Sequence, residues 1–545
     1  MAGDRTIPTC SRLALSAATL ALAVASLPAV AQIERFAAYV RARAAEARGE
    51  VGAAASDYAR VLAATPDDPA IAARTWREAM AAGDLALARR AATTALDTSR
   101  PGNGAIAAEV SLLRVADAIH GGDTAALARA LAAMKDGPLD FLTPVIAAWG
   151  SLGNAVDPAG TLVATKQTGA FARVVRENRA LLLIATNRFD VAVPDLQALL
   201  ADSSGELDLR YAAAELLAGQ GKSDIAMKLV AGNDVEVAGF RAAIPVAKPS
   251  AAFGVSRLFT RVAADLDDAR TAPLAVALTR SALLLDPSDD RARLVLARAL
   301  GRMKAYRRAL AVLGEVAPTS AFRGPAAQLH IGLLRASGDD AGSLAAAKAL
   351  AEAPGASATA AQVYADLLAD NGHPREAIAA YDRARDRMGK DAGWEIWLQI
   401  ATANDSAGDW RQARAAFDRA VKLGGNEAVA LTSYGAALVA RGEDLPRAVA
   451  MLERANTLTP DKPEISGALA WAYLRQGDGA RALPLLETAS RQAPADSSIA
   501  EHLGDAYWAA GRRYEARYAW RAALVVADGA AVLRIETKLR DGLAS

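Results

Sequence analysis

A pattern that recurs every 34 residues constrains this sequence more than any other feature. Its clearest copy spans residues 504–524, where two short segments flank Gly511. Gly504 and Ala516 carry almost no side chain, so the segments can pack closely as helices with Trp520 beside them. Glycine at position 511 permits the left-handed turn between the helices. One helix pair cannot bury its apolar face alone, so the pattern predicts neighbouring copies.

The neighbouring copies are present and keep their phase. One step back from Gly504 leads to Ala470, and further steps of 34 to 36 residues lead to Gly435, Ala401 and Ala365. The pattern resembles the tetratricopeptide repeat, which has a period of 34 and the motif W-x2-L-G-x2-Y, then A-x3-F, then A and P. This resemblance implies an all-α fold, a right-handed superhelical solenoid of tandem helix–turn–helix repeats.

The phase of the pattern divides the chain into predicted segments. Pro245, Pro249 and Gly254 mark a stretch without helical phase, which we interpret as a linker or break. A final helix reads as a solvating cap. The predicted segments are a degenerate N-terminal solenoid (32–234), the linker (235–255), a C-terminal solenoid (256–530) and the capping helix (531–545). The C-terminal repeats are predicted to start near Ser256, Asp290, Gly324, Ala358, Trp394, Ala428, Pro463 and Ser497.

The first 31 residues have the layout of a secretory signal peptide. A weakly basic start precedes an uncharged apolar run, and Ala29-Val30-Ala31 offers small residues for cleavage before Gln32. The alternative is an uncleaved membrane anchor, because the run nearly reaches spanning length. We expect cleavage after Ala31 and a periplasmic or exported chain without a transmembrane segment. The single cysteine, Cys10, would be lost with the signal, so we expect neither disulfides nor thiol chemistry.

The charge balance argues against nucleic acid and anionic lipid as main partners. The chain has 62 Lys+Arg and 61 Asp+Glu. Residues 1–31 contain Arg5, Arg12 and Asp4, so 60 of each sign remain without them. A neutral chain has no long-range field to attract polyanions. We therefore expect protein or peptide partners.

Motifs for catalysis, metals and cofactors are not recognisable. Gly221-Lys222-Ser223 resembles the end of a phosphate loop, but Leu216 stands where the first glycine belongs. The four histidines fall on separate repeats. Acidic pairs such as Asp267-Asp268 fall at loops or helix ends, where aspartate caps or is solvated. We therefore expect no enzyme activity and no cofactor.

The candidate binding residues come from the resemblance. In tetratricopeptide arrays the first helix of each repeat lines a concave groove that binds peptides. The matching positions of the last two repeats that are not used for packing give our candidates: Trp471, Arg475, Glu501, Asp505 and Trp508. The two tryptophans are either binding anchors or filler between adjacent first helices. Arg291, Arg298 and Arg302 would form a basic patch in an earlier repeat.

These observations predict a non-catalytic scaffold or adaptor of the cell envelope. It would hold a peptide or protein in the groove, since a preformed surface limits the ordering cost of binding. One alternative is an accessory or assembly subunit of an envelope or polysaccharide export machine. Another is a catalytic repeat protein, a glycosidase or transferase, which would need a closed, acid-lined pocket.

Overall fold

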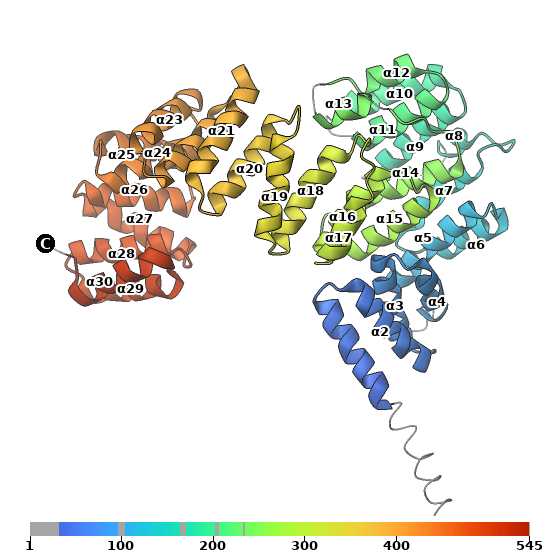
Figure 1. Cartoon of the computed structure of the whole chain (residues 1–545), viewed down its shortest axis with the longest axis horizontal. Helices are drawn as coiled ribbons and strands as arrows, with labels where there is room; N and C mark the ends of the chain where they lie inside the picture. Colours follow the sequence, from blue (N-terminus) through green and yellow to red (C-terminus); the bar gives the residue numbers. More distant parts are fainter. Residues whose placement is uncertain are drawn as a thin grey trace, which may run out of the picture. The chain divides into compact units, whose positions relative to one another are not determined.

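The computed structural model describes residues 32–95, 104–163, 171–201, 207–232, 235–242 and 244–543. These residues form helices joined by turns, and none of them lies in a β-strand. The predicted signal peptide lies outside the described residues. None of the described helices is both long enough and apolar enough to cross a bilayer. The predicted all-α solenoid class is confirmed (Figure 1).

The chain divides into two compact units, which we call unit 1 (Met1–Ala346) and unit 2 (Ala347–Ser545). The predicted linker at 235–255 does not coincide with this division. Two helices enter the stretch that was expected to lack helical phase. α13 spans Val235–Ala242, and α14 begins at Ala251, where Ser250 caps it through the amide of Phe253. The prolines of this stretch occupy only the short connection between the two helices.

The described part of unit 1 begins with a helix over residues 32–47. The labelled helices that follow are α2 (Val51–Ala64), α3 (Pro69–Ala82), α4 (Leu85–Ala95), α5 (Gly104–His120), α6 (Thr124–Met134), η1 (Asp140–Leu142), α7 (Thr143–Gly150), α8 (Pro158–Thr161), α9 (Phe171–Ala185), α10 (Phe189–Ala201), α11 (Leu207–Gly219), α12 (Ser223–Leu229), α13, α14 (Ala251–Ala264), α15 (Ala272–Leu285), α16 (Asp290–Arg302), α17 (Tyr306–Gly314) and α18 (Arg323–Ala336). Helix α19 (Asp340–Glu352) crosses the boundary.

Packing within unit 1 is not limited to neighbours in the chain. Helices α14 and α15 return onto the first helices of the N-terminal repeats, so that α15 packs on α3 and α5, and α14 packs on α5, α7, α9 and α11. At Gly254 the approach is so close that a Cβ atom would lie 1.9 Å from the Trp149 ring. Arg280 donates hydrogen bonds to the carbonyl oxygens of Met80 and Ala81, both at 3.0 Å. One continuous apolar core results.

Unit 2 is a regular array of helix pairs. Its helices are α20 (Ala358–Asp370), α21 (Pro374–Met388), η2 (Gly389–Asp391), α22 (Trp394–Ser406), α23 (Trp410–Leu423), α24 (Ala428–Arg441), α25 (Leu445–Leu458), α26 (Pro463–Arg475), α27 (Gly479–Gln492), α28 (Ser497–Ala509), α29 (Arg513–Val526) and α30 (Gly529–Asp541). The first helices α20, α22, α24, α26 and α28 begin at the predicted repeat starts. The repeat phase is therefore confirmed here.

The local physics of one repeat is visible in α28 and α29. Asp496 caps α28 by accepting hydrogen bonds from two first-turn amides. Gly511 has φ +78°, the left-handed conformation that the turn requires. A Cβ atom at Gly504 would lie 2.3 Å from the Trp520 ring, so only glycine allows this approach. Trp520 is fully buried. Within unit 2, substantial helix packing joins only elements that are adjacent or two apart in the chain.

Candidate functional site: the first-helix face of unit 2 and two charged clusters

A hollow crosses three successive repeats of unit 2 on the side of their first helices. It extends from the end of α20, the turn after it and the facing side of α21 across α22 to Ser433 of α24. We call this surface, with the matching positions of α26 and α28, the first-helix face. The hollow is lined by Ala369, Asp370, Gly372, Pro374, Tyr381, Leu398, Gln399, Thr402, Ala403, Ser406 and Ser433. The lining offers hydroxyl, amide and carboxylate groups around one large apolar side chain, Leu398.

A chain of hydrogen bonds fixes the polar side of this hollow. Gln362 donates to the amide oxygen of Gln399 at 2.9 Å, and Gln399 donates to Asp366 at 3.0 Å. The Tyr381 hydroxyl donates to the same carboxylate at 2.7 Å. Burial and the Asp366 carboxylate together hold the pKa of Tyr381 far above its ordinary value, so the hydroxyl keeps its proton. The side chains are therefore ordered before any partner arrives.

Trp471 and Arg475 lie on α26 at the seam with α28. The Trp471 ring stacks on His502, with ring centroids 4.0 Å apart and planes inclined by 6°. The Arg475 guanidinium lies 5.7 Å from the Trp471 ring and donates to the Val439 carbonyl at 3.1 Å. Burial lowers the pKa of His502 to about 4, so the stack is neutral at physiological pH. Trp471 is half-buried, and its stack on His502 joins α26 to α28.

Glu501 and Asp505 are held by the capping helix. Both residues are 3% exposed. Glu501 accepts hydrogen bonds from Arg534 and Lys538, and Asp505 accepts from Lys538 and from the Trp520 indole. Burial alone would raise the pKa of Glu501, but its two cationic donors lower it to about 2. For Asp505, burial outweighs Lys538 and raises the pKa.

Helix α30 is therefore more than a solvating cap. Its exposed side includes Arg540, but Ile535 is fully buried and Lys538 is directed at the two carboxylates of α28. Trp508 also belongs to this region: its ring lies 5.3 Å from the Trp520 ring and against Gly542, with the Arg513 guanidinium 3.7 Å from its centroid. The structure thus brings the candidate residues together as two groups, Trp471 with Arg475 and Glu501 with Asp505, with Trp508 packed under the end of α30.

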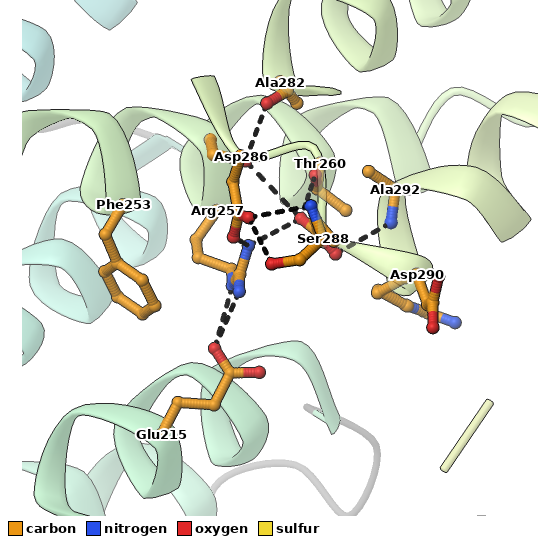
Figure 2. Close-up of polar contacts among 12 residues, drawn as sticks. Glu215, Phe253, Arg257, Thr260, Ala282, Asp286, Ser288, Asp290 and Ala292 are labelled. Atoms are coloured by element: carbon orange, nitrogen blue, oxygen red, sulfur yellow. Dashed lines mark hydrogen bonds and ion pairs between the residues drawn. The ribbon is translucent and has the colours of Figure 1, made fainter. Parts of the chain in front are cut away.

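A buried charged cluster lies in unit 1 and centres on Arg257 of α14. Figure 2 shows this side chain pointing toward Glu215 of α11, with the Phe253 ring beside it. The guanidinium contacts Glu215 at 2.8 Å, Asp289 at 2.7 Å and Asp286 at 3.0 Å. Burial would lower the pKa of Arg257, but the three carboxylates raise it, so the residue remains charged. The cluster fastens the returning helix α14 to α11.

A small cavity of about 30 Å³ adjoins this cluster. Its lining includes four carboxylates and three arginines from α9, α11, α14 and the start of α16. Arg257 pairs with Glu215 and Asp289, Arg261 contacts Glu177 at 3.5 Å, and Arg291 pairs with Asp208 at 2.6 Å. A cavity of this size has room for one or two water molecules. It is too small for a sugar ring.

The basic patch predicted from Arg291, Arg298 and Arg302 is wrong, because two of these arginines form ion pairs. Arg291 forms its ion pair with Asp208, and Arg302 pairs with Asp267. Asp208 lies 83 residues before Arg291, a separation that the repeat period does not reveal, whereas Asp267 lies about one repeat step before Arg302. Sequence reasoning also missed the hollow on α20–α24, because it searched for tryptophans on the last two repeats. The matching groove positions of α22, including Leu398 and Thr402, were the available signal.

Family models described as tetratricopeptide repeat match residues 398–463 and 438–506. These residues are helix pairs of unit 2 with the close first-to-second helix packing described above. This is a tetratricopeptide repeat protein. The matched segments begin on α22 and end within α28, so they include part of the first-helix face.

One curated relative of this tetratricopeptide repeat protein is the cytochrome c-type biogenesis protein CycH of Rhizobium meliloti (strain 1021). The two chains are 30% identical over 155 residues, which is 27% of this chain and 39% of CycH. The match thus spans less than half of that relative. Among solved structures, the APC/C hetero-tetramer Cut9–Hcn1 aligns at 14% identity and TM-score 0.38, covering 94% of this chain and 96% of that chain. PilF of Pseudomonas aeruginosa aligns at 16% identity and TM-score 0.29, covering 34% and 85%.

Proposed function

We propose that this protein is a non-catalytic scaffold of the cell envelope that binds a protein or peptide partner on the first-helix face of unit 2. The observation that carries the proposal is the hollow across α20, α22 and α24. A surface continuous over three repeats can hold an extended segment of a partner. Its polar groups would pair with the partner's backbone, and Leu398 would contact an apolar side chain.

The hollow is preorganised for this role. The hydrogen bonds that join Gln362, Gln399, Asp366 and Tyr381 fix four side chains in the free protein. Binding therefore does not have to order these side chains, which lowers its entropic cost. The tetratricopeptide repeat itself supports an interaction role.

The partner site would continue toward α26 and α28. Trp471 and Arg475 offer an aromatic ring and a cation there, and Trp508 lies near the end of the array. Glu501 and Asp505 already bind Arg534 and Lys538. Of the five candidate residues, we therefore expect Trp471 and Arg475 to contribute most to binding, and the two carboxylates to act through the position of α30.

The envelope location is part of the proposal. It rests on the signal-like layout of residues 1–31, with its apolar run and Ala29-Val30-Ala31. The name of the relative CycH, a cytochrome c-type biogenesis protein, favours one specific version of the scaffold. In this version the protein is an accessory or assembly subunit of an envelope machine whose chemistry is performed by other proteins.

A non-catalytic role also fits the acid-lined cavity in unit 1. A glycosidase or transferase would need carboxylates that face a substrate in a cleft. Here Glu215 and Asp289 face Arg257, and Asp208 faces Arg291. The charges serve to join helices, and the cavity does not admit a sugar.

Site-specific photo-cross-linking in intact cells tests the proposed site. A photoreactive residue would replace Thr402 in the hollow, and the matched control would carry it at Arg411, an exposed residue of the outer helix α23. We expect a discrete protein adduct from position 402, absent from position 411, and weakened by Leu398→Asp. Equal adducts from both positions, or none from 402, would contradict binding on this face. The identity of the adduct distinguishes an assembly machine from another envelope partner.

A further inference from the structure

The outer face of α29 carries a stripe that the other second helices of unit 2 lack. We call Tyr514, Arg517, Tyr518, Arg521 and Val525 the α29 stripe. Tyr514, Tyr518 and Val525 are 82%, 70% and 85% exposed. Spacings of four, three and four residues place 514, 518, 521 and 525 on one side of the helix, over about 17 Å. Large apolar side chains so exposed, along one line, mark an interaction surface.

The preceding repeats show that packing does not require these residues. The position of Tyr518 is occupied by Ala379, Ala415, Ala450 and Pro484 in α21, α23, α25 and α27. All four are exposed and small. These helices pack in the same way with small residues at that position. The Tyr518 side chain is therefore not needed for packing of the repeat, and it is exposed to solvent.

At the position of Arg521, the charge is opposite to that in the other second helices of unit 2. The equivalents of Arg521 are Asp382, Asp418, Glu453 and Glu487. Three of these carboxylates accept a hydrogen bond from a tyrosine of the following first helix, as Glu487 does from Tyr507 at 2.8 Å. In α29 a cation stands at this position. At this position α29 is therefore basic where the other second helices of unit 2 are acidic.

The arginines of the stripe have no carboxylate partner among the described residues. Arg517 lies 6.0 Å from the centroid of the Trp508 ring, and it forms no ion pair there. The one acidic residue of α29, Glu515, is engaged by Arg512 at 3.0 Å. Two unpaired guanidinium groups beside two tyrosines form a surface that complements an anionic, partly apolar ligand.

We propose that the α29 stripe is a second docking surface, for an acidic segment of a partner protein. Tyrosine and arginine are the side chains that dominate protein interfaces. An anionic membrane surface is less well matched, because lipid-binding clusters carry about four to eight basic residues and the stripe carries two. The stripe lies on a second helix, so it is separate from the first-helix face proposed above.

Fluorescence anisotropy with defined peptides tests this assignment. The probe is a labelled helical peptide of about 12 residues, which matches the length of the stripe, composed of Glu, Ala and Leu. A version with Gln for Glu is the neutral control. We expect the acidic peptide to bind and the neutral one to bind far more weakly. Arg517→Glu with Arg521→Glu should weaken the acidic peptide by roughly 30-fold, the loss typical of hot-spot side chains, and Tyr514→Ala with Tyr518→Ala should also weaken it.

The matched control reverses two exposed outer-face arginines elsewhere, Arg411 of α23 and Arg491 of α27, to glutamate. It changes the net charge equally and should leave binding intact. A Lys version of the peptide should bind the Arg517→Glu, Arg521→Glu variant, which would show that this variant is folded. The proposal is overturned if both double reversals weaken binding equally, if the wild-type chain does not bind the acidic peptide, or if vesicles of phosphatidylglycerol, rather than the peptide, depend on Arg517 and Arg521.

Discussion

The two units use related helix pairs in different ways. In unit 1, α14 and α15 pack on the first helices α3, α5, α7, α9 and α11, so the chain covers this face with its own residues. In the described part of unit 2, the substantial contacts of the first helices are with their neighbours in the array, and a hollow crosses three of them. The comparison teaches that the repeat alone does not make a binding surface. The first helices form a binding surface only where no other part of the chain already packs on them.

The ion pairs that join neighbouring elements also differ in burial between the units, apart from the buried pairs of Lys538 with Glu501 and Asp505 in unit 2. The ion pairs that hold α14 in unit 1 are buried: Arg257 and its partners Glu215 and Asp289 have side chains 16%, 7% and 3% exposed. The pairs between neighbouring second helices and turns of unit 2, such as Arg447 with Asp418, are about two-fifths exposed. Buried pairs are costly to break because one charge is left without compensation, whereas exposed pairs contribute little.

The largest expected effect is therefore the loss of Arg257. Arg257→Met leaves Glu215 and Asp289 buried without their cation, and we expect unit 1 to lose about 3–5 kcal/mol of stability. The control in unit 2, Arg447→Met, should cost less than about 1 kcal/mol. Denaturant unfolding followed by hydrogen exchange in each unit measures both changes. Equal costs would show that the two units are held together in the same way.

Glu78 in unit 1 and Glu501 in unit 2 should make opposite contributions to the pH dependence of stability. Glu78 of α3 is buried, its Oε2 has no hydrogen-bond partner among the described residues, and burial with Glu46 nearby raises its pKa to about 7. The folded state therefore favours the protonated form, and this contribution to stability is present below pH 4.5 and lost as the pH rises through 7. Gln at this position cannot ionise. Glu78→Gln should therefore stabilise unit 1 by up to about 3 kcal/mol at pH 8, with little effect at pH 4.

Glu501 provides the contrasting case in unit 2. Its pKa of about 2 lies below the ordinary 4.5. Its contribution is therefore present above pH 4.5 and lost as the pH falls toward 2. Glu501→Gln should destabilise the α28–α30 region at pH 7 by up to about 3 kcal/mol, and the difference from wild type should shrink below pH 3. Thermal unfolding across this pH range checks both variants. A difference that does not change with pH would contradict the assigned ion pair.

Two glycines in unit 1 test the closeness of the returning helix. Gly254→Ala places a Cβ atom against the Trp149 ring, and we expect a cost of about 1–3 kcal/mol. Gly332 of α18 is exposed with open space around it, so Gly332→Ala should stabilise by about 0.4–1 kcal/mol. We expect the melting temperature to fall for Gly254→Ala and to rise for Gly332→Ala. A stabilising Gly254→Ala would mean that α14 does not press on Trp149.

The period of the sequence was sufficient to predict most of unit 2. Its repeats pack through positions such as Gly504 and Trp520, which recur at fixed offsets, so local spacing determines where each helix begins. The contacts between α28 and α30 could also have been predicted, because Glu501 and Arg534 lie about one repeat step apart and have opposite charges.

The fold of unit 1 could not be predicted in this way. Arg280 reaches a carbonyl 200 residues away, and no periodicity specifies such a pairing. In the sequence, Arg257 and Arg291 look like solvated residues of exposed helices. Only the return of α14–α16 onto α11 buries Arg257 and pairs Arg291 with Asp208. Long-range burial thus changed residues expected at a surface into internal ion pairs. The binding roles of Trp471, Arg475, Glu501, Asp505 and Trp508 stay predictions.

The central claim is that the chain covers the first helices of unit 1 and presents those of unit 2 to a partner. Hydrogen exchange with and without the protein cross-linked from position 402 tests it most directly. We predict that α3, α5 and α7 are strongly protected in the free chain and unchanged on binding, whereas α20, α22 and α24 exchange faster alone and slow when the partner is added. Slower exchange in α3, α5 and α7 with no change in unit 2 would contradict the account.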